Sequence, residues 1–173
     1  MASDGTVAVS DLLKHHSFRR ADEAQIRRCV EDNNKKRFAL STGPGGELRI
    51  RASQGHSIDT VDADKLLTRI TPESAAQYQV VVHGTQASVL PAIRDKGLSR
   101  MTRQHIHFAK GLFGDEGVVS GMRATCNAYI YIDLPAAVND GFEFFESANG
   151  VILTPGNSDG FLPPQYFSRV DVK

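Results

Sequence analysis

Residues suited to binding a phosphate occur together in segment 50–57. Arg51 ends an alternating stretch there and is followed by Gln54, His56 and Ser57. A planar guanidinium can hold two phosphate oxygens at once, while amide and hydroxyl groups orient the ligand without adding charge. The segment is equally compatible with a solvent-exposed strand arginine followed by an ordinary loop.

A second set of polar candidates lies farther along the chain. His83-Gly84-Thr85 ends an apolar run, where side chains project into a cleft and a glycine lets a flat ligand approach the backbone. A histidine with a purely structural role is the alternative. His105 and His107 have the spacing that places both on one side of a strand, as in a metal-binding pair. No third ligand follows at a recognisable spacing, so we expect no metal.

Two further loops contain polar residues, and each alone is compatible with ordinary loop chemistry. Ser120-Gly121-Met122-Arg123 is a turn with another arginine, and segment 147–150 precedes an apolar stretch. The sequence has neither a P-loop nor a Gly-x-Gly-x-x-Gly fingerprint. This argues against phosphate-loop and Rossmann enzymes.

The composition is typical of a globular protein, with 40% hydrophobic and 23% charged residues among 173. The net charge is zero, but residues 1–58 carry +3 and the remainder −3, which suggests separate roles for the two parts. Cys29 and Cys126 are far apart, and we expect both to be reduced. The sequence has no secretory signal and no apolar stretch of about 18 residues. We therefore expect an intracellular protein of the cytoplasm or nucleus, without a membrane anchor.

The elements that must position these residues fall into two lobes, and the first spans residues 1–58. We expect a short helix at 10–13 capped by Ser10, and a second helix with a capping box of Asp22 and Gln25 and an apolar stripe at 26, 29 and 30. Segments 35–40 and 47–52 flank a Gly-Pro-Gly-Gly turn and predict a hairpin with Arg49 and Arg51 on one face. Helices followed by a basic hairpin favour a winged-helix-like lobe, whose first helix we expect upstream of Met1.

The second lobe is predicted to span residues 78–173, after a linker at 59–77. Strands are expected at 78–83, 105–108, 128–132 and 151–154. A helix is expected at 88–96, with Val89, Leu90 and Ile93 as its apolar stripe and Gly97 as its end. Many short strands with few helices indicate an α+β fold.

The order of these segments resembles that of the RNA 2′-phosphotransferase family. The resemblance covers Asp4-Gly5 with Val7 and Val9, Asp11-Leu12-Leu13, Asn33 to Phe38, Ile50 to Ser57, His83-Gly84-Thr85, Gly97-Leu98, His105-Ile106-His107, Ser120 to Arg123 and Ser147 to Gly160. It implies a winged-helix lobe joined to a β-rich lobe with the fold of NAD-dependent ADP-ribosyltransferases. It also implies removal of the splice-junction 2′-phosphate of tRNA. The phosphate would attack the nicotinamide ribose and expel nicotinamide. The ribose 2″-hydroxyl would then attack phosphorus, freeing RNA with a 2′-hydroxyl and giving ADP-ribose 1″,2″-cyclic phosphate.

The resemblance also implies roles for individual residues. Arg51 and Arg123 would be catalytic, holding the phosphate and balancing charge. The residues implied to bind NAD, which is consumed, are His83, Gly84, Thr85, His105, His107 and Ser120. Those implied to bind 2′-phosphorylated tRNA or another RNA are Lys36, Arg37, Gln54, His56 and Ser57. No metal and no obligate protein partner are implied.

The family also uses an Arg-His pair on its first helix, and this sequence contains no Arg-His dipeptide. Without the pair we expect NAD binding and the first step to persist and the second step to be slow. Two alternatives stay open. One is an ADP-ribosyltransferase that modifies terminal phosphates of RNA or DNA, and the other is a non-catalytic RNA-binding module.

Overall fold

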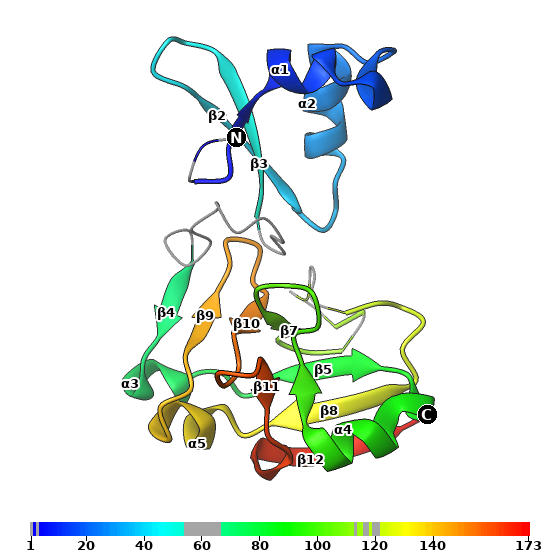
Figure 1. The fold of residues 1–173 in the computed structure, drawn as a ribbon, viewed down its shortest axis with the longest axis vertical. Helices are drawn as coiled ribbons and strands as arrows, with labels where there is room; N and C mark the ends of the chain where they lie inside the picture. The colour runs from blue at the N-terminus through cyan, green and yellow to red at the C-terminus, as the bar shows by residue number, and fades with distance from the viewer. Residues whose placement is uncertain (1, 3, 54–66, 113, 116–117, 119–121) are drawn as a thin grey trace. The chain divides into compact units, whose positions relative to one another are not determined.

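The computed structural model describes residues 2, 4–53, 67–112, 114–115, 118 and 122–173. The chain divides into two compact units, 1–66 and 67–173, and each is considered by itself (Figure 1). Both contain helices and strands, which confirms the α+β prediction. Among the helices of the described residues, none combines the length and apolar character needed to cross a membrane.

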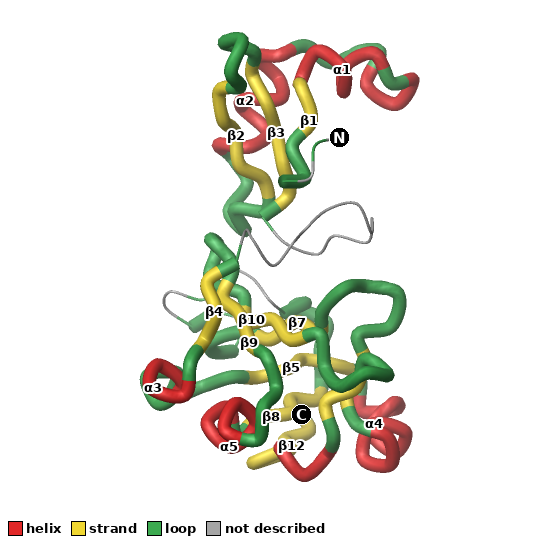
Figure 2. The backbone as a smooth tube through the Cα atoms, turned by 60° about the vertical axis from the view of Figure 1, so that its left-hand side comes forward, coloured by secondary structure: helices red, strands yellow, loops and turns green. Residues whose placement is uncertain are grey.

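The first unit is a three-stranded antiparallel sheet with helices packed against it. Its elements are β1 Val7–Ala8, α1 Val9–Lys14, the 3-10 helix η1 His16–Phe18, α2 Glu23–Glu31, β2 Phe38–Thr42 and β3 Leu48–Ala52. Figure 2 shows the strands side by side in the order β1-β3-β2. Val9, Ile26 and Ile50 form the buried core between helices and sheet.

The hairpin and the capping box predicted for the first unit are confirmed. The side chain of Asp22 accepts from the backbone N–H of Gln25 at 2.8 Å, and the Gln25 side chain accepts from the N–H of Asp22 at 2.9 Å. The expected cap at Ser10 is wrong, because α1 begins earlier, after Ala8, and Ser10 lies inside its first turn. Cys29 is exposed rather than part of the buried stripe of α2.

The second unit contains two main antiparallel sheets. Its elements are β4 Thr68–Ile70, α3 Pro72–Ala75, β5 Val82–Thr85, η3 Ala87–Val89, α4 Leu90–Lys96, β6 Leu98–Ser99, β7 Ile106–Phe108, β8 Ala128–Ile132, α5 Leu134–Asn139, β9 Phe144–Glu146, β10 Ile152–Thr154, β11 Phe161–Leu162, η4 Pro164–Tyr166 and β12 Phe167–Val172. The sheets have the orders β4-β9-β10-β7 and β12-β8-β5, and β11 pairs with β6. A bridge between Val82 and Ala109 connects β5 to the end of β7.

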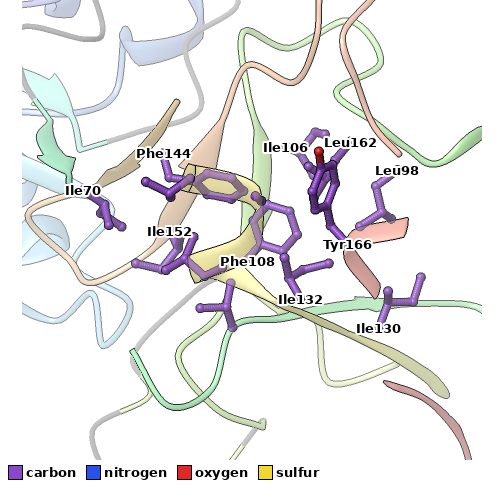
Figure 3. Close-up of a cluster of buried hydrophobic side chains, with 14 of the residues drawn as sticks. Ile70, Leu98, Ile106, Phe108, Ile130, Ile132, Phe144, Ile152, Leu162 and Tyr166 are labelled. Carbon is purple, nitrogen blue, oxygen red and sulfur yellow. The ribbon is translucent and has the colours of Figure 1, made fainter. Parts of the chain in front are cut away.

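The core of the second unit is larger than that of the first. Phe108 and Phe144 pack at its centre, with ring centroids 6.0 Å apart, among aliphatic side chains from both main sheets (Figure 3). A separate cluster lies on the other face of β5 and β8, where Val82, Met122 and Tyr129 are buried. The β5 strand is therefore packed on both faces.

The element predictions for this unit need two corrections. The strand expected at 78–83 begins only at Val82. Tyr78 follows directly after a turn instead of lying in a strand, and its hydroxyl donates to Glu146 Oε2 at 2.7 Å. The helix expected at 88–96 is the 3-10 turn η3 followed by α4, and Val89 of its expected apolar stripe is 43% exposed. Of the segment predicted as a linker, residues from Leu67 on are described and contain β4 and α3.

Candidate active site

His83 lies on β5, and its ring contacts two residues of β7. Its Nδ1 lies 2.8 Å from the backbone carbonyl oxygen of His107, and Phe108 meets the ring at an edge, 5.9 Å between centroids. Because a carbonyl oxygen only accepts, Nδ1 donates the proton and Nε2 of the neutral ring is an acceptor. Burial lowers the pKa of His83. The ring therefore offers a hydrogen-bond acceptor near neutral pH.

His107 on β7 is a second neutral histidine. Burial, followed by the positive charge of Arg103, lowers the pKa of His107 to about 4. Its Nε2 is buried and has no hydrogen-bond partner among the described residues. Buried polar atoms normally have a partner, and unpaired ones often mark a place for a ligand or water. His107 is thus a candidate ligand contact.

His105 completes a group of three histidines predicted from the sequence. It is buried just before β7 and packs edge-on against Phe145, 6.1 Å between centroids. The charges that His105 and His83 carry when protonated also lower the pKa of His107. Across the described ranges, no group of three His, Cys, Asp or Glu side chains is arranged to hold a metal ion.

Gly84 is packed against protein atoms on the side where a side chain would project. A Cβ there would lie 2.5 Å from Met122 Cγ and 3.0 Å from Cys126 Sγ, closer than packed atoms approach. The sequence suggested that this glycine makes room for a ligand. On that side of β5, Gly84 accommodates the loop after β7, and its predicted role in binding NAD stays a prediction.

Thr85 ends β5 and joins it to the segment that contains Arg123. The carbonyl oxygen of Thr85 accepts from the backbone N–H of Asn127 at 3.1 Å. Arg123 itself is exposed, and its carbonyl oxygen accepts from the N–H of Cys126 at 3.2 Å. Its guanidinium forms no ion pair with any described residue. Arg123 therefore stands on a turn fastened to the His83-Gly84-Thr85 strand, with its charge available.

Arg51 on β3 has a similarly available charge, in contrast to its neighbour Arg49. The guanidinium of Arg49 contacts Glu47 Oε1 at 2.9 Å and Thr6 Oγ1 at 3.0 Å. Arg51 is half-buried, lies opposite Ala39 in the ladder, and has no ion pair within the described residues. The two arginines share a face of β3, as predicted, but only Arg51 is left for a ligand.

Lys36 and Arg37 lie beside the end of β3 that follows Arg51. Lys36 has a positive φ of 45°, and its carbonyl oxygen accepts from Ser53 Oγ at 3.0 Å. The carbonyl oxygen of Arg37 accepts from the N–H of Ser53 at 2.8 Å. These bonds fix the basic turn to the hairpin, so the structure brings Lys36, Arg37 and Arg51 together.

For some predicted residues the structure gives no relative placement. Gln54, His56, Ser57 and Ser120 lie outside the described residues. Arg51 belongs to the first unit and Arg123 to the second, and each is placed only within its own unit.

Sequence reasoning missed the residues that hold the Arg123 turn, namely Met122, Cys126, Gln86 and Asn127. A signal for them was present, because an isolated glycine inside a strand often marks the close approach of another segment. It also missed a network in which Glu146 accepts from Tyr78 and, at 2.6 Å, from Lys110 Nζ. These three residues line a pocket of about 410 Å³ together with Gln77, Gln79 and Val80, and no predicted site residue lines that pocket.

Comparison with known proteins identifies a family that matches most of the chain. The family described as "RNA 2'-phosphotransferase, Tpt1 / KptA family" matches residues 1–156. A tRNA 2'-phosphotransferase 1 of Danio rerio is 46% identical over 170 residues, covering 98% of this chain and 75% of the relative. The Homo sapiens protein of that name is 48% identical, covering 98% and 66%, and a tRNA 2'-phosphotransferase of Saccharomyces cerevisiae is 34% identical, covering 99% and 74%.

Proposed function

Because the chain belongs to the RNA 2′-phosphotransferase, Tpt1 / KptA family, we propose that it removes a 2′-phosphate from RNA, in the first place tRNA, by transfer to NAD. The observation that carries this proposal is the family match over residues 1–156, which includes every candidate site residue. The relatives bearing the name tRNA 2'-phosphotransferase support tRNA as the substrate.

The charges of Arg51 and Arg123 support a phosphate-handling role. Both lack an ion pair within the described residues, whereas Arg49 and Arg169 are paired with Glu47 and Asp171. Donors held in advance where charge develops in a transition state stabilise it strongly. We assign Arg51 and Arg123 to the 2′-phosphate, where they would balance charge during both the attack on the NAD ribose and the release of RNA.

The histidine group fits NAD as the co-substrate. His83 Nε2 is an acceptor suited to a ribose hydroxyl, and His107 Nε2 is a buried ring nitrogen without a described partner. Both rings are neutral near pH 7 because burial lowers their pKa values. They would orient the nicotinamide ribose without adding charge. We extend the NAD site to His105, Thr85 and the main chain of Gly84, which lie next to these histidines in the second unit.

The basic residues of the first unit support a role for it in RNA binding. Lys36 and Arg37 form a basic turn fixed beside Arg51, and we propose that they contact the RNA backbone. Affinity for RNA should then fall with rising salt, and less steeply in Lys36→Ala and Arg37→Ala. We also propose that residues 1–58 form a winged-helix-like lobe and residues 78–173 an ADP-ribosyltransferase-like lobe. The sheet β1-β3-β2 with its helices and the two main sheets of the second unit support this assignment.

The test is a reaction of an oligonucleotide carrying one internal 2′-phosphate with labelled NAD. Free nicotinamide reports the first step, and ADP-ribose 1″,2″-cyclic phosphate reports the second. Both are followed because the sequence contains no Arg-His dipeptide, the pair implied to serve in the second step. A matched oligonucleotide with only a 5′-terminal phosphate is the control substrate.

We expect nicotinamide release that depends on the internal 2′-phosphate. Faster release with the terminal phosphate would instead identify an ADP-ribosyltransferase of nucleic-acid ends. Binding of RNA without any nicotinamide release would identify a non-catalytic module and contradict the proposal.

A further inference from the structure

We propose that Gly84 is a positioning residue for Arg123. Because Gly84 has no side chain, Met122 and Cys126 can pack against β5. This packing fixes the turn at 122–127 and thereby the position of the Arg123 guanidinium. The inference rests on the proposed function for its kinetic consequence. Its structural part stands on the packing of the second unit alone.

A side chain at position 84 would require Met122 to move. Met122 is 7% exposed and contributes Cγ and Sδ at 2.5 and 3.0 Å from the position of a Cβ, and Cys126 contributes Sγ at 3.0 Å. Gly84 lies opposite Tyr129 in the ladder, and the hydroxyl of Tyr129 donates to the carbonyl oxygen of Cys126 at 3.0 Å. Residues on both sides of the turn are thus packed onto the same face of β5 and β8.

Hydrogen bonds fasten the same turn to the end of β5. Gln86 Nε2 donates to the carbonyl oxygen of Thr125 at 2.8 Å. The N–H of Asn127 donates to Thr85, and Asn127 Oδ1 accepts from the N–H of Ala87 at 2.8 Å. The segment after Arg123 is therefore attached to β5 at several successive residues.

Arg123 depends on this attachment because nothing else described fixes its position. It lies outside the helices and strands, is exposed, and has no ion pair among the residues that the structure describes. A bidentate arginine is sensitive to misplacement, and an error of about 1 Å near reacting atoms can cost about a hundredfold in rate. A shift of Met122, the adjacent residue, should therefore appear in turnover.

The competing explanation is that Gly84 lacks a side chain because NAD, and not Met122 and Cys126, needs that space. The two explanations differ in which kinetic constant changes. Loss of a ligand approach raises KM for NAD, whereas displacement of Arg123 lowers kcat. They also differ in rescue. Shortening Met122 removes the closest clash with a new methyl group, at 2.5 Å, and leaves only the contact with Cys126 Sγ at 3.0 Å, but it does nothing for a clash with NAD.

The experiment compares Gly84→Ala, Met122→Ala and the double variant with the unmodified chain. We expect Gly84→Ala to lower kcat about ten- to a hundredfold with little change in KM for NAD. The double variant should recover most of that loss, since the methyl group added at position 84 occupies space vacated by the Met122 side chain. Gly45→Ala, in the hairpin turn of the first unit, is the control, because a Cβ there meets only the flexible Glu47 carboxylate at 3.1 Å.

A second readout needs neither NAD nor RNA. Hydrogen exchange of the amides in 122–127 should become about tenfold faster in Gly84→Ala and return toward the original rate in the double variant. A raised KM without rescue, or unchanged exchange in Gly84→Ala, would overturn the proposal. If the unmodified chain releases no nicotinamide, the proposed function fails and exchange alone decides the role of Gly84.

Discussion

Arg51 and Arg123 are carried by different kinds of structure in the two units. Arg51 lies in the central strand of a sheet, where ladder pairing with Ala39 fixes its backbone. Arg123 lies on an irregular turn whose position depends on side chains packed and bonded to β5. A regular strand holds a residue through many equivalent bonds, whereas a packed turn relies on a few specific contacts. Placement of Arg123 should therefore be the more sensitive to single substitutions.

The strongest test of the comparison changes the arginines themselves. Arg51→Lys and Arg123→Lys should each lower kcat/KM by about 10²- to 10³-fold, the range for loss of one charge-stabilising donor. Lysine keeps the charge but not the planar pair of donors. Steady-state kinetics with 2′-phosphorylated RNA and NAD measure the effect.

Each unit provides an ion-paired arginine as the matched control. Arg49 contacts Glu47, and Arg169 bonds Asp171 at 3.0 Å with its guanidinium 3.9 Å from the centre of the Tyr131 ring. Arg49→Lys and Arg169→Lys should change stability more than kcat/KM. A loss of activity in Arg49→Lys as large as that in Arg51→Lys would refute the distinction between them.

Acid should weaken the second unit through His107. The folded-state pKa of His107, about 4, lies below its ordinary 6.5, so the unfolded chain binds the proton first as pH falls. Stability contributed above pH 6.5 is then lost between pH 6.5 and 4, by up to about 1.4 kcal/mol per pH unit for this ring. Amide exchange resolved by peptide should show this slope in residues 67–173. The slope should be smaller in His107→Asn, and an equal slope would rule out His107 as its source.

Helix caps offer a matched pair of changes, one in each unit. Asp22 caps α2, and Asp133 caps α5 by accepting from the N–H of Ala136 at 3.0 Å. Asp22→Ala and Asp133→Ala should each cost about 1 kcal/mol. Exchange measurements should place the first loss within residues 1–53 and the second within 67–173. Equal loss in both units from either variant would mean that they unfold together.

The sequence was sufficient to predict features that depend on local periodicity. The hairpin of β2 and β3, the Asp22–Gln25 capping box and the strand β8 all follow from neighbouring residues. Strands β4, β9 and β12 were not predicted, because each is defined by a partner distant in sequence. The packing of Met122 against Gly84 likewise depends on residues that are distant in sequence. A glycine in a strand signals a close approach, but only the fold shows that Met122 makes it.

The smallest expected effect tests a single bond of the Arg123 turn. Gln86→Glu replaces the Nε2 donor with an oxygen that faces the carbonyl of Thr125, so the bond of 2.8 Å is lost. An exposed hydrogen bond contributes about 0.5–1.5 kcal/mol, and kcat should fall about threefold while KM for NAD stays the same. Gln79→Glu makes the same charge change at an exposed residue beside the Tyr78–Glu146 pocket and should leave kcat unaltered. Because the remaining contacts at Gly84 and Asn127 persist, a loss as large as that of Arg123→Lys would mean that Gln86 contacts the substrate instead of the turn.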